Sequence, residues 1–378
     1  MKEVYITRLA KCLPNEPVGN DEMELILGKI DGRPSRARAI VLNSNKIQTR
    51  YYAMDKDGNA THTNASMTAE AVQNLFDDKF PIGKMELLAC GTTSPDQMLP
   101  NHAVMVHGLL KCQPVEVIAA TGACAAGMQA FKYAYMSVKS GNTSNAVSTG
   151  SERLSPWMMA EKFEPETAIV SEIQGNPIIA FEKDFLRWML SDGACAALFQ
   201  DKPNEEGLSL RIDWVEIASF ANEYETCMYA GGVKTPDGGV KGWVDMKPTE
   251  WAQDSVFSLK QDTKILGKNI VPIGTKWWKE LIDKHQVNLD EIDYFLPHLS
   301  SEFFRMKIDE EMLRLGVHVP QEKWFTNLTK VGNVGTASPY LMLEELLNTG
   351  KLKKGQKIVM MIPESARFSY SFAQITVV

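Results

Sequence analysis

Short apolar runs and amphipathic segments alternate along the whole chain. Runs of strand length occupy residues 4–9, 85–90, 115–120, 292–296, 357–362 and 371–378. Segments with apolar residues three and four positions apart, the helical period, occupy residues 67–76, 100–110, 125–140 and 301–315. This alternation is typical of an α/β protein whose sheets are covered by helices.

Two helices in the second half carry clear local signals. In residues 301–315, the side chains of Phe304, Ile308 and Met312 fall on one apolar stripe. The pair Ser338-Pro339 predicts the start of another helix, with Ser338 as the N-cap and Pro339 at the first helical position.

A polar stretch at residues 201–207 separates the chain into two parts of similar size. It contains Pro203 and Gly207 and follows an apolar segment, so we expect the boundary between two halves there. Residues 156–190 are predicted to form a long irregular loop rich in Trp, Met, Phe and Pro. A loop of that length is uncommon and often functional, so we expect it to shape a binding pocket.

Composition and charge exclude several classes of protein. The 378 residues are 44% hydrophobic and 23% charged, which fits a globular protein and not a disordered one. The net charge of −7 argues against a general nucleic-acid binder, which is usually basic. The N-terminal residues lack the apolar core of a signal peptide, and no apolar run is long enough to cross a bilayer. A cytoplasmic location without membrane insertion is therefore the default expectation.

The cysteines do not form a recognisable disulfide or metal framework. Six are present, at positions 12, 90, 112, 124, 195 and 227, and no CxxC pair occurs. A cytosolic chain of this length keeps its thiols reduced, and a structural zinc site usually needs paired cysteines. The ordinary role of each is that of a small buried apolar residue.

Cys124 lies at a turn between a predicted strand and a predicted helix. Residues 115–120 are followed by Thr121-Gly122-Ala123-Cys124-Ala125-Ala126-Gly127, and then by a helix to about residue 140. Free backbone N–H groups at a helix N-terminus favour an anion and lower the pKa of a thiol. The N–H of Cys124 is also placed to hold an oxyanion. The alternative is a buried thiol that fills space at a crowded turn.

Two residues of the second half are candidate partners for this thiol. His298 follows a strand and precedes a helix, as Cys124 does, whereas the other five histidines have no such position. Asn333 lies between Gly332 and a further glycine, just before the helix that starts at 338. An asparagine between glycines is ordinarily a turn residue. Its functional alternative is an amide donor that points into a pocket.

Several blocks resemble the beta-ketoacyl-ACP synthase III group of the thiolase superfamily. They are residues 44–52 (SNKIQTRYY), 91–96 (GTTSPD), 123–127 (ACAAG), 150–155 (GSERLS) and 191–197 (SDGACAA), with His298 and Asn333 at the places of two catalytic residues. The resemblance runs from near residue 40 to the C-terminus. It implies a thiolase-like α/β fold in which two similar α/β halves form a five-layered αβαβα core. Residues 1–203 would carry Cys124, and residues 204–378 would carry His298 and Asn333.

The C-terminal loop departs from the pattern of that group. A glycine-rich loop there normally supplies the second oxyanion-hole N–H, but residues 363–369 read PESARFS. The backbone at Ser365 and Ala366 is the expected substitute, although Arg367 changes the pocket. The usual His-Gln-Ala-Asn is also His298-Leu299-Ser300-Ser301. Fatty-acid initiation from acetyl-CoA is therefore a weaker expectation. The chain also resembles a branch that makes dialkylresorcinols and flexirubin-type lipids.

The resemblance implies a reaction and its partners. An acyl group would be loaded on Cys124 and joined to a β-keto or malonyl-type thioester in a Claisen condensation, with His298 and Asn333 stabilising the enolate. No metal or redox cofactor is implied. The substrates would be carried by coenzyme A or by an acyl carrier protein, with Arg36 and Arg38 as weak candidates for carrier binding and a homodimer as the expected assembly. The alternatives are acyl transfer to an oxygen or nitrogen nucleophile, and a non-catalytic partner subunit of a heterodimer.

Overall fold

A computed structural model describes residues 1–35, 37–163 and 185–378. Nine strands form one hydrogen-bonded network in the order β13-β14-β15-β8-β1-β7-β6-β4-β5. Their bounds are β1 (Tyr5–Cys12), β4 (Leu87–Thr92), β5 (Glu116–Thr121), β6 (Asn145–Glu152), β7 (Gly193–Gln200), β8 (Leu210–Ser219), β13 (Ile292–Pro297), β14 (Lys357–Glu364) and β15 (Ser369–Val377).

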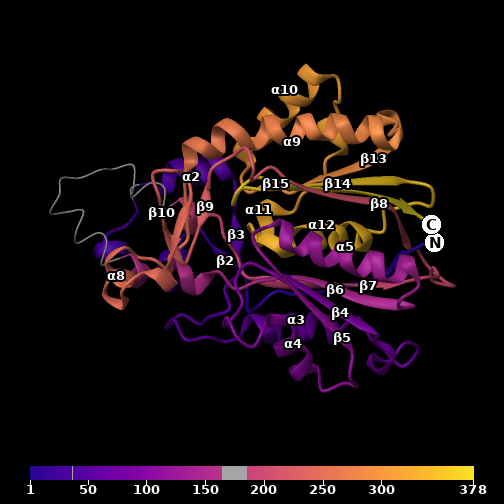
Figure 1. Ribbon diagram of the computed structural model, residues 1–378, viewed down its shortest axis with the longest axis horizontal. Coiled ribbons are helices and arrows are strands. Elements are labelled where there is room, and N and C mark those ends of the chain that lie inside the picture. The colour runs from indigo at the N-terminus through magenta and orange to yellow at the C-terminus, as the bar shows by residue number, and fades with distance from the viewer. Residues whose placement is uncertain (36, 164–184) are drawn as a thin grey trace.

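The network consists of two sheets that touch at one place. Strands β8 and β1 share only the pairs Tyr5↔Arg211 and Ile6↔Leu210, whereas β8 and β15 pair along almost their whole length. On one side of this junction lie β1, β7, β6, β4 and β5, and on the other lie β8, β15, β14 and β13. The two sets of strands therefore form separate layers, as Figure 1 shows.

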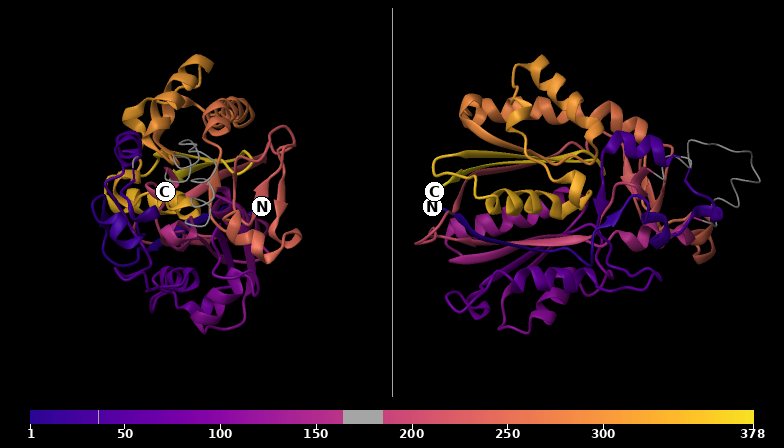
Figure 2. Two further views of the ribbon diagram at one scale, coloured as in Figure 1. Left: turned by 90° about the vertical axis from the view of Figure 1, so that its left-hand side faces the viewer. Right: turned by 180° about the vertical axis from the view of Figure 1, so that it is seen from behind.

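Helices fill the space between the sheets and cover their outer faces. Helices α5 (Ala125–Ser140) and α12 (Ser338–Asn348) lie between the two sheets, and both bury most of their side chains. Helices α3 (Asn64–Gln73) and α4 (His102–Leu110) cover one outer face, and α9 (Thr263–His285) and α10 (Arg305–Leu315) cover the other (Figure 2). These five layers confirm the thiolase-like αβαβα architecture.

Smaller elements surround one end of the sheets. They include α1 (Met23–Ile26), α2 (Arg38–Asn45), β2 (Val18–Gly19), β3 (Thr49–Arg50), β9 (Met228–Tyr229), β10 (Gly232–Lys234), β11 (Val240–Gly242), α8 (Pro248–Gln253), β12 (Lys260–Gln261) and α11 (Leu328–Val331). The loop between β7 and β8 covers the stretch 201–207. The division into residues 1–203 and 204–378 remains a prediction.

The start of α12 differs from the expectation by one residue. Ala337 is the N-cap, Ser338 is the first helical residue and Pro339 the second. A short 3-10 turn, Gly335–Ala337, leads directly into the helix, so Ser338 is already helical. Its hydroxyl instead accepts a hydrogen bond from the N–H of Val334 at 3.1 Å. Proline in the first turn is as predicted.

Two glycines allow the central helix and β6 to approach the turn before α12. A Cβ atom on Gly127 or Gly150 would lie 2.4 or 2.2 Å from the carbonyl oxygen of Thr336, closer than any real contact. Only glycine fits at such an approach of two backbones. This packing brings the segment that contains Asn333 next to the start of α5.

No helix in the described part of the chain is both long and apolar enough to cross a membrane.

Candidate active site

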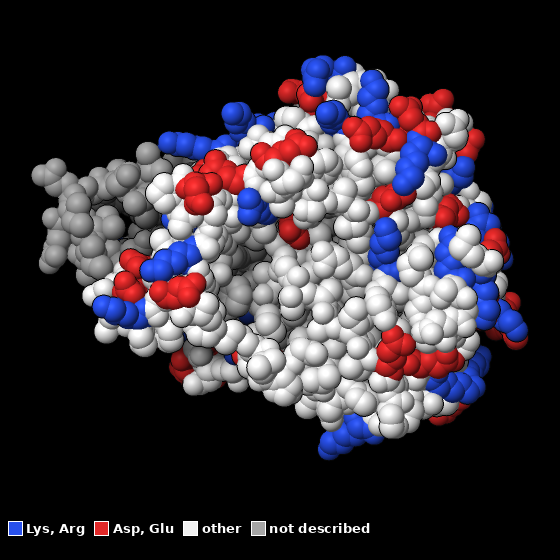
Figure 3. Space-filling model, in the orientation of Figure 1, with Lys and Arg blue, Asp and Glu red and all other residues white. Residues whose placement is uncertain are grey.

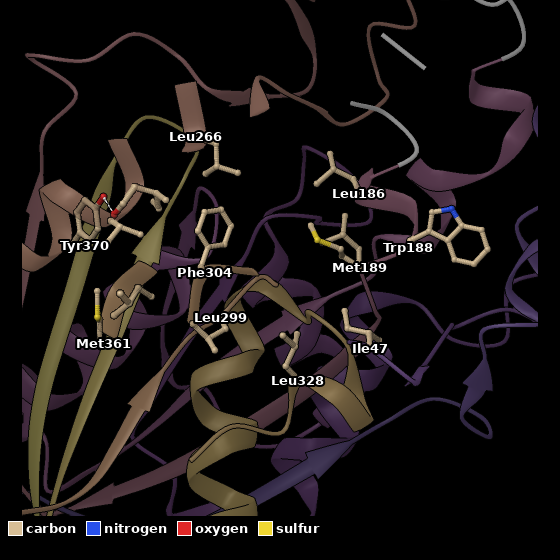
Figure 4. Close-up of a cluster of buried hydrophobic side chains, with 14 of the residues drawn as sticks. Ile47, Leu186, Trp188, Met189, Leu266, Leu299, Phe304, Leu328, Met361 and Tyr370 are labelled. Atoms are coloured by element: carbon tan, nitrogen blue, oxygen red, sulfur yellow. Dashed lines mark hydrogen bonds between the residues drawn. The ribbon is translucent and has the colours of Figure 1, made fainter. Parts of the chain in front are cut away.

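One cavity gathers the three residues that the sequence singles out. Cys124, His298 and Asn333 all line it, although they come from the ends of different elements. Its apolar wall is formed by Leu154, Leu186, Met189, Leu190, Met228, Leu259, Leu266 and Ile270. Figure 4 shows Leu266 of α9 in one apolar cluster with Leu186 and Met189, which precede β7.

Cys124 occupies the N-cap of α5, three positions after the last residue of β5. Its backbone has helical dihedral angles, and the N–H of Ala126 already bonds to the carbonyl of Ala123 at 2.8 Å. The neighbours Ala123 and Ala125 are buried, whereas Cys124 is partly exposed. The residue lines the cavity.

The electrostatic surroundings of this thiol differ from the expectation. A carboxylate oxygen of Glu364, at the end of β14, accepts a hydrogen bond from the N–H of Ala125 at 3.1 Å. A negative group thus occupies the helix N-terminus that was expected to favour a thiolate. Desolvation raises the pKa of the Cys124 thiol, and the charges of Glu364 and Glu152 raise it further. The prediction of a lowered pKa is therefore wrong, and the resting thiol is neutral.

Glu364 is itself held in an unusual state. It is buried, and burial raises the pKa of its carboxyl, while its hydrogen bonds with the backbone of Ala125 and Ala123 partly offset that rise. Sequence reasoning gave this residue no role. The available signal was its position at the start of a loop where the resemblance expects glycine.

His298 follows the last residue of β13. Its backbone N–H donates to the carbonyl of Met361 in β14 at 2.8 Å, which fixes the residue at the end of the sheet. The side chain is buried, and desolvation lowers the pKa of the imidazole to about 4. Nε2 is buried without a hydrogen-bond partner. The ring is therefore neutral near pH 7 and has one nitrogen available to a ligand.

Asn333 is anchored through both its backbone and its side chain. Its N–H donates to Met189 at 2.8 Å, and its carbonyl accepts from Ser191 at 2.9 Å. Its side-chain Oδ1 accepts a hydrogen bond from the N–H of Gly335 at 3.0 Å. Because an N–H must face the oxygen of an amide, this bond fixes the orientation of the group. The Nδ2 donor is then directed away from Gly335.

Glu152 connects the segments around Asn333, and sequence reasoning gave it no role either. One of its oxygens accepts hydrogen bonds from the N–H of Thr336 at 3.1 Å and the hydroxyl of Thr93 at 2.6 Å. The other accepts from the hydroxyl of Ser94 at 2.7 Å. This fully buried carboxylate thus ties the end of β6 to the turn after Asn333 and to the loop after β4.

The two expected oxyanion-hole positions behave differently. Ser365 lines the cavity, but Ala366 is not among the lining residues. The carbonyl oxygen of Ala366 accepts hydrogen bonds from Cys227 and Met228 at 2.9 and 3.2 Å. The loop after β14 is therefore attached to the segment that contains β9, and only Ser365 of the pair borders the cavity.

The candidate carrier-binding arginines are only partly described. Arg36 lies outside the described residues. Arg38 forms an ion pair with Asp21, and its guanidinium lies 5.6 Å from the ring centre of Trp188. The acidic partner offsets its charge, so Arg38 offers less attraction to an acidic carrier than a lone arginine would. Among the described residues, no group of three or more His, Cys, Asp and Glu is placed to hold a metal.

Comparisons with known proteins agree with this arrangement. Residues 282–362 match the family model described as 3-Oxoacyl-[acyl-carrier-protein (ACP)] synthase III C terminal. Beta-ketoacyl-[acyl-carrier-protein] synthase III of Clostridium perfringens is 26% identical over 319 residues, 83% of each chain. A tetronic acid condensing enzyme overlays with a TM-score of 0.77 at 19% identity, covering 99% of each chain. OleA of Xanthomonas campestris overlays with a TM-score of 0.74 at 18% identity, also covering 99% of each.

The full-length overlays define the class of protein: this chain has the thiolase-like α/β fold. The match of residues 282–362 includes both His298 and Asn333, and the curated relative extends over most of the chain. Within that class, the sequence is similar to beta-ketoacyl-[acyl-carrier-protein] synthase III, the acyltransferase that the matched model and relatives describe.

Proposed function

We propose that the protein is a ketosynthase that loads an acyl thioester on Cys124 and condenses it with a second thioester. The observation that carries the proposal is a single cavity with apolar walls in which a thiol, a neutral imidazole and an oriented amide meet. A nucleophile together with neutral hydrogen-bond donors suits acyl transfer followed by enolate formation.

The first half-reaction would transfer the acyl group to the enzyme. The sulfur of Cys124 attacks the thioester carbonyl, and the thiol of the carrier leaves with a proton. The N–H of Cys124 and the backbone at Ser365 would hold the oxyanion, with Ala366 in a supporting position. Because the resting thiol is neutral, its proton must be removed as attack proceeds. The acyl chain would lie against the wall that includes Leu186 and Leu266.

The second half-reaction would form the carbon–carbon bond. Nε2 of His298 and Nδ2 of Asn333 would donate to the carbonyl oxygen of the second thioester, which stabilises its enolate. The enolate forms when the second thioester loses a proton from C2 or, for a malonyl thioester, carbon dioxide. Its carbon attacks the acyl carbonyl, the bond to Cys124 breaks, and the released thiolate takes up a proton. A neutral imidazole fits this role because it can donate one N–H to the enolate oxygen without a charged partner beside the ring.

We further propose a place in the synthesis of dialkylresorcinols or related aryl lipids. Support comes from the apolar wall, which suits a chain longer than acetyl, and from the loop 363–369, which departs from the initiating enzymes. A similar structure, OleA, is described with bound lauric acid and lauroyl-CoA, so a long acyl chain fits this fold in that protein. The carriers would be coenzyme A or an acyl carrier protein.

A homodimer is the assembly that we propose. Strand β5 forms one end of the strand order, so one of its edges has no partner strand in the described part of the chain. Most of its side chains are only half-buried, and the nearby helices expose Leu109 and Met136. Figure 3 shows that the lower middle of this face carries hardly any charged side chains. An apolar edge of this kind is usually covered.

Mass spectrometry of the intact protein after exposure to a panel of acyl thioesters would test the proposal. We expect one acyl group on the wild type and none on Cys124→Ala. His298→Ala and Asn333→Ala should load the acyl group but lose condensation by a factor on the order of 10²–10³. Normal condensation by both variants would overturn the assignment. An ester or amide product would indicate an oxygen or nitrogen acceptor, and a wild type that never loads would indicate a non-catalytic partner subunit.

A further inference from the structure

A polar pair lies in the wall of the cavity apart from Cys124, His298 and Asn333. The Nε2 amide of Gln261 donates to the hydroxyl oxygen of Ser365 at 2.8 Å, and both residues line the cavity. Gln261 is 6% exposed, so its amide is almost completely removed from solvent. A buried polar pair beside apolar walls is the kind of feature that fixes the orientation of a ligand.

The pair is held in place from two directions. Gln261 is the last residue of β12, which pairs with β9 through Gln261↔Met228. Ser365 follows β14, and the next residue, Ala366, accepts the backbone hydrogen bonds of Cys227 and Met228. The same short segment therefore positions both members of the pair, which keeps the hydroxyl preorganised.

The proton of the Ser365 hydroxyl has only a weak hydrogen-bond acceptor within the protein. Its oxygen accepts from Gln261, while its own proton points to the sulfur of Met228 at 3.8 Å. A thioether sulfur is a weak acceptor, so an oxygen atom in the cavity would be a better one. Ser365 is thus a donor that a substrate carbonyl can take over.

The other proposed hydrogen-bond donors of the cavity are each assigned to a substrate carbonyl group, and the Ser365 hydroxyl remains for a further one. In the proposed reaction, the acyl carbonyl takes the N–H of Cys124, and the thioester carbonyl of the second substrate takes His298 and Asn333. We propose that the Ser365 hydroxyl, held by Gln261, binds the 3-oxo group of the second thioester and so selects a β-ketoacyl substrate over a malonyl one. This inference rests on the proposed function and names the substrate class of the same site.

The charge of the cavity supports the same choice. Among the described residues that line it, none is a lysine or an arginine. A malonyl carboxylate would be buried there without a cation, which is costly, whereas a neutral ketone needs only a hydrogen bond.

Single-turnover condensation with the acyl group already loaded on Cys124 tests the inference. The enzyme is mixed with a 3-oxooctanoyl or a malonyl thioester, and the condensed product is quantified. We expect the wild type to prefer the 3-oxoacyl substrate. Ser365→Ala should lower the second-order rate constant of condensation with the 3-oxoacyl substrate by about tenfold, which is the effect of losing one hydrogen bond. Acyl loading and the slow malonyl reaction should fall by much less than that factor, because the substitution keeps the backbone N–H of residue 365.

Three further variants sharpen the result. Ser365→Thr keeps a hydroxyl and should retain the preference, while Gln261→Met should lose part of it because the hydroxyl is no longer held. Ser219→Ala, which removes an exposed hydroxyl outside the cavity, is the control. Equal losses with both substrates, no loss, or a wild type that condenses only malonyl would each overturn the inference while leaving the condensing function intact. A wild type that cannot be loaded would overturn both.

Discussion

At the scale of the residue, the site is unusual in the charges that surround the nucleophile. Burial raises the pKa of Cys124, two carboxyl groups, Glu364 and Glu152, raise it further, and one of them occupies the N-terminus of α5. The imidazole of His298 is at the same time kept neutral by burial. The protein thus holds both the proposed nucleophile and the proposed enolate donor in their uncharged states before substrate arrives.

Replacing the carboxyl of Glu364 should make Cys124 more reactive near neutral pH. In the wild type, the rate of alkylation by iodoacetamide should keep rising above pH 9, because the pKa of the thiol lies above its ordinary value. Glu364→Gln removes a negative charge, so the pKa should fall and alkylation at pH 8 should accelerate severalfold. Glu322→Gln, on a distant 3-10 turn, is the control. An unchanged pH profile would show that Glu364 does not act on the thiol.

We expect the lowered pKa of His298 to set the acid limit of the proposed condensation. The folded pKa of about 4 lies below the ordinary 6.5, so the neutral ring persists as the pH falls and is protonated only near pH 4. The stabilisation linked to this group is complete above pH 6.5 and is lost as the pH falls through 4. The rate of condensation by preloaded enzyme should therefore not decline through pH 6.5. Circular dichroism at each pH separates loss of the donor from unfolding, and a midpoint near 6.5 in folded protein would contradict the assignment.

At the scale of the element, close packing of backbones positions the site, and α9 shows what local patterns miss. This helix of 23 residues contains Pro272 and Gly274, which ordinarily argue against a helix interior. A Cβ on Gly274 would lie 2.5 Å from the ring of Tyr370, so tertiary packing selects glycine there. The sequence analysis accordingly did not predict α9, although Leu266 and Ile270 of this helix line the cavity.

Adding one methyl group to β6 should displace the segment of Asn333. In Gly150→Ala, the new Cβ would meet the carbonyl of Thr336, and either the turn or the strand must shift. We expect a loss of about 1–3 kcal/mol in the free energy of unfolding, measured with urea, and a larger fall in condensation than in acyl loading. Gly108→Ala in α4, where a Cβ meets nothing within 4 Å, should be neutral or stabilising by about 0.5–1 kcal/mol. Equal stabilities of the two variants would contradict the packing argument.

At the scale of the whole molecule, the two sheets enclose α5 and α12 and bring residues distant in sequence to one cavity. The hydroxyl of Tyr340 in α12 donates to the carbonyl of Gly127 in α5 at 2.8 Å, so the central layer is joined by a buried hydrogen bond. The open edge of β5 and the apolar residues around it are the part of this architecture that a second copy would cover.

Charged side chains on that surface should separate a homodimer. Leu109→Glu combined with Met136→Glu changes two exposed residues, so the fold should persist while the association weakens by at least tenfold. Sedimentation velocity would follow the change from dimer to monomer. Leu313→Glu on α10 is a matched exposed substitution on the other outer layer and should leave the dimer unchanged. A wild type that sediments as a monomer would overturn the proposed assembly.

The sequence by itself determined the fold class, most of the strands near the site and the place of Cys124 at the start of a helix. Those features depend on local periodicity, on small residues at a turn and on blocks that resemble a known family. Only the tertiary structure decided the charge state of the site and the composition of its walls. The pKa of Cys124 depends on Glu364, 240 positions away, and the polar pair of Gln261 and Ser365 joins two segments that no local pattern connects. Burial and distance between remote residues are properties of the packed chain, so they cannot be read from neighbours in sequence.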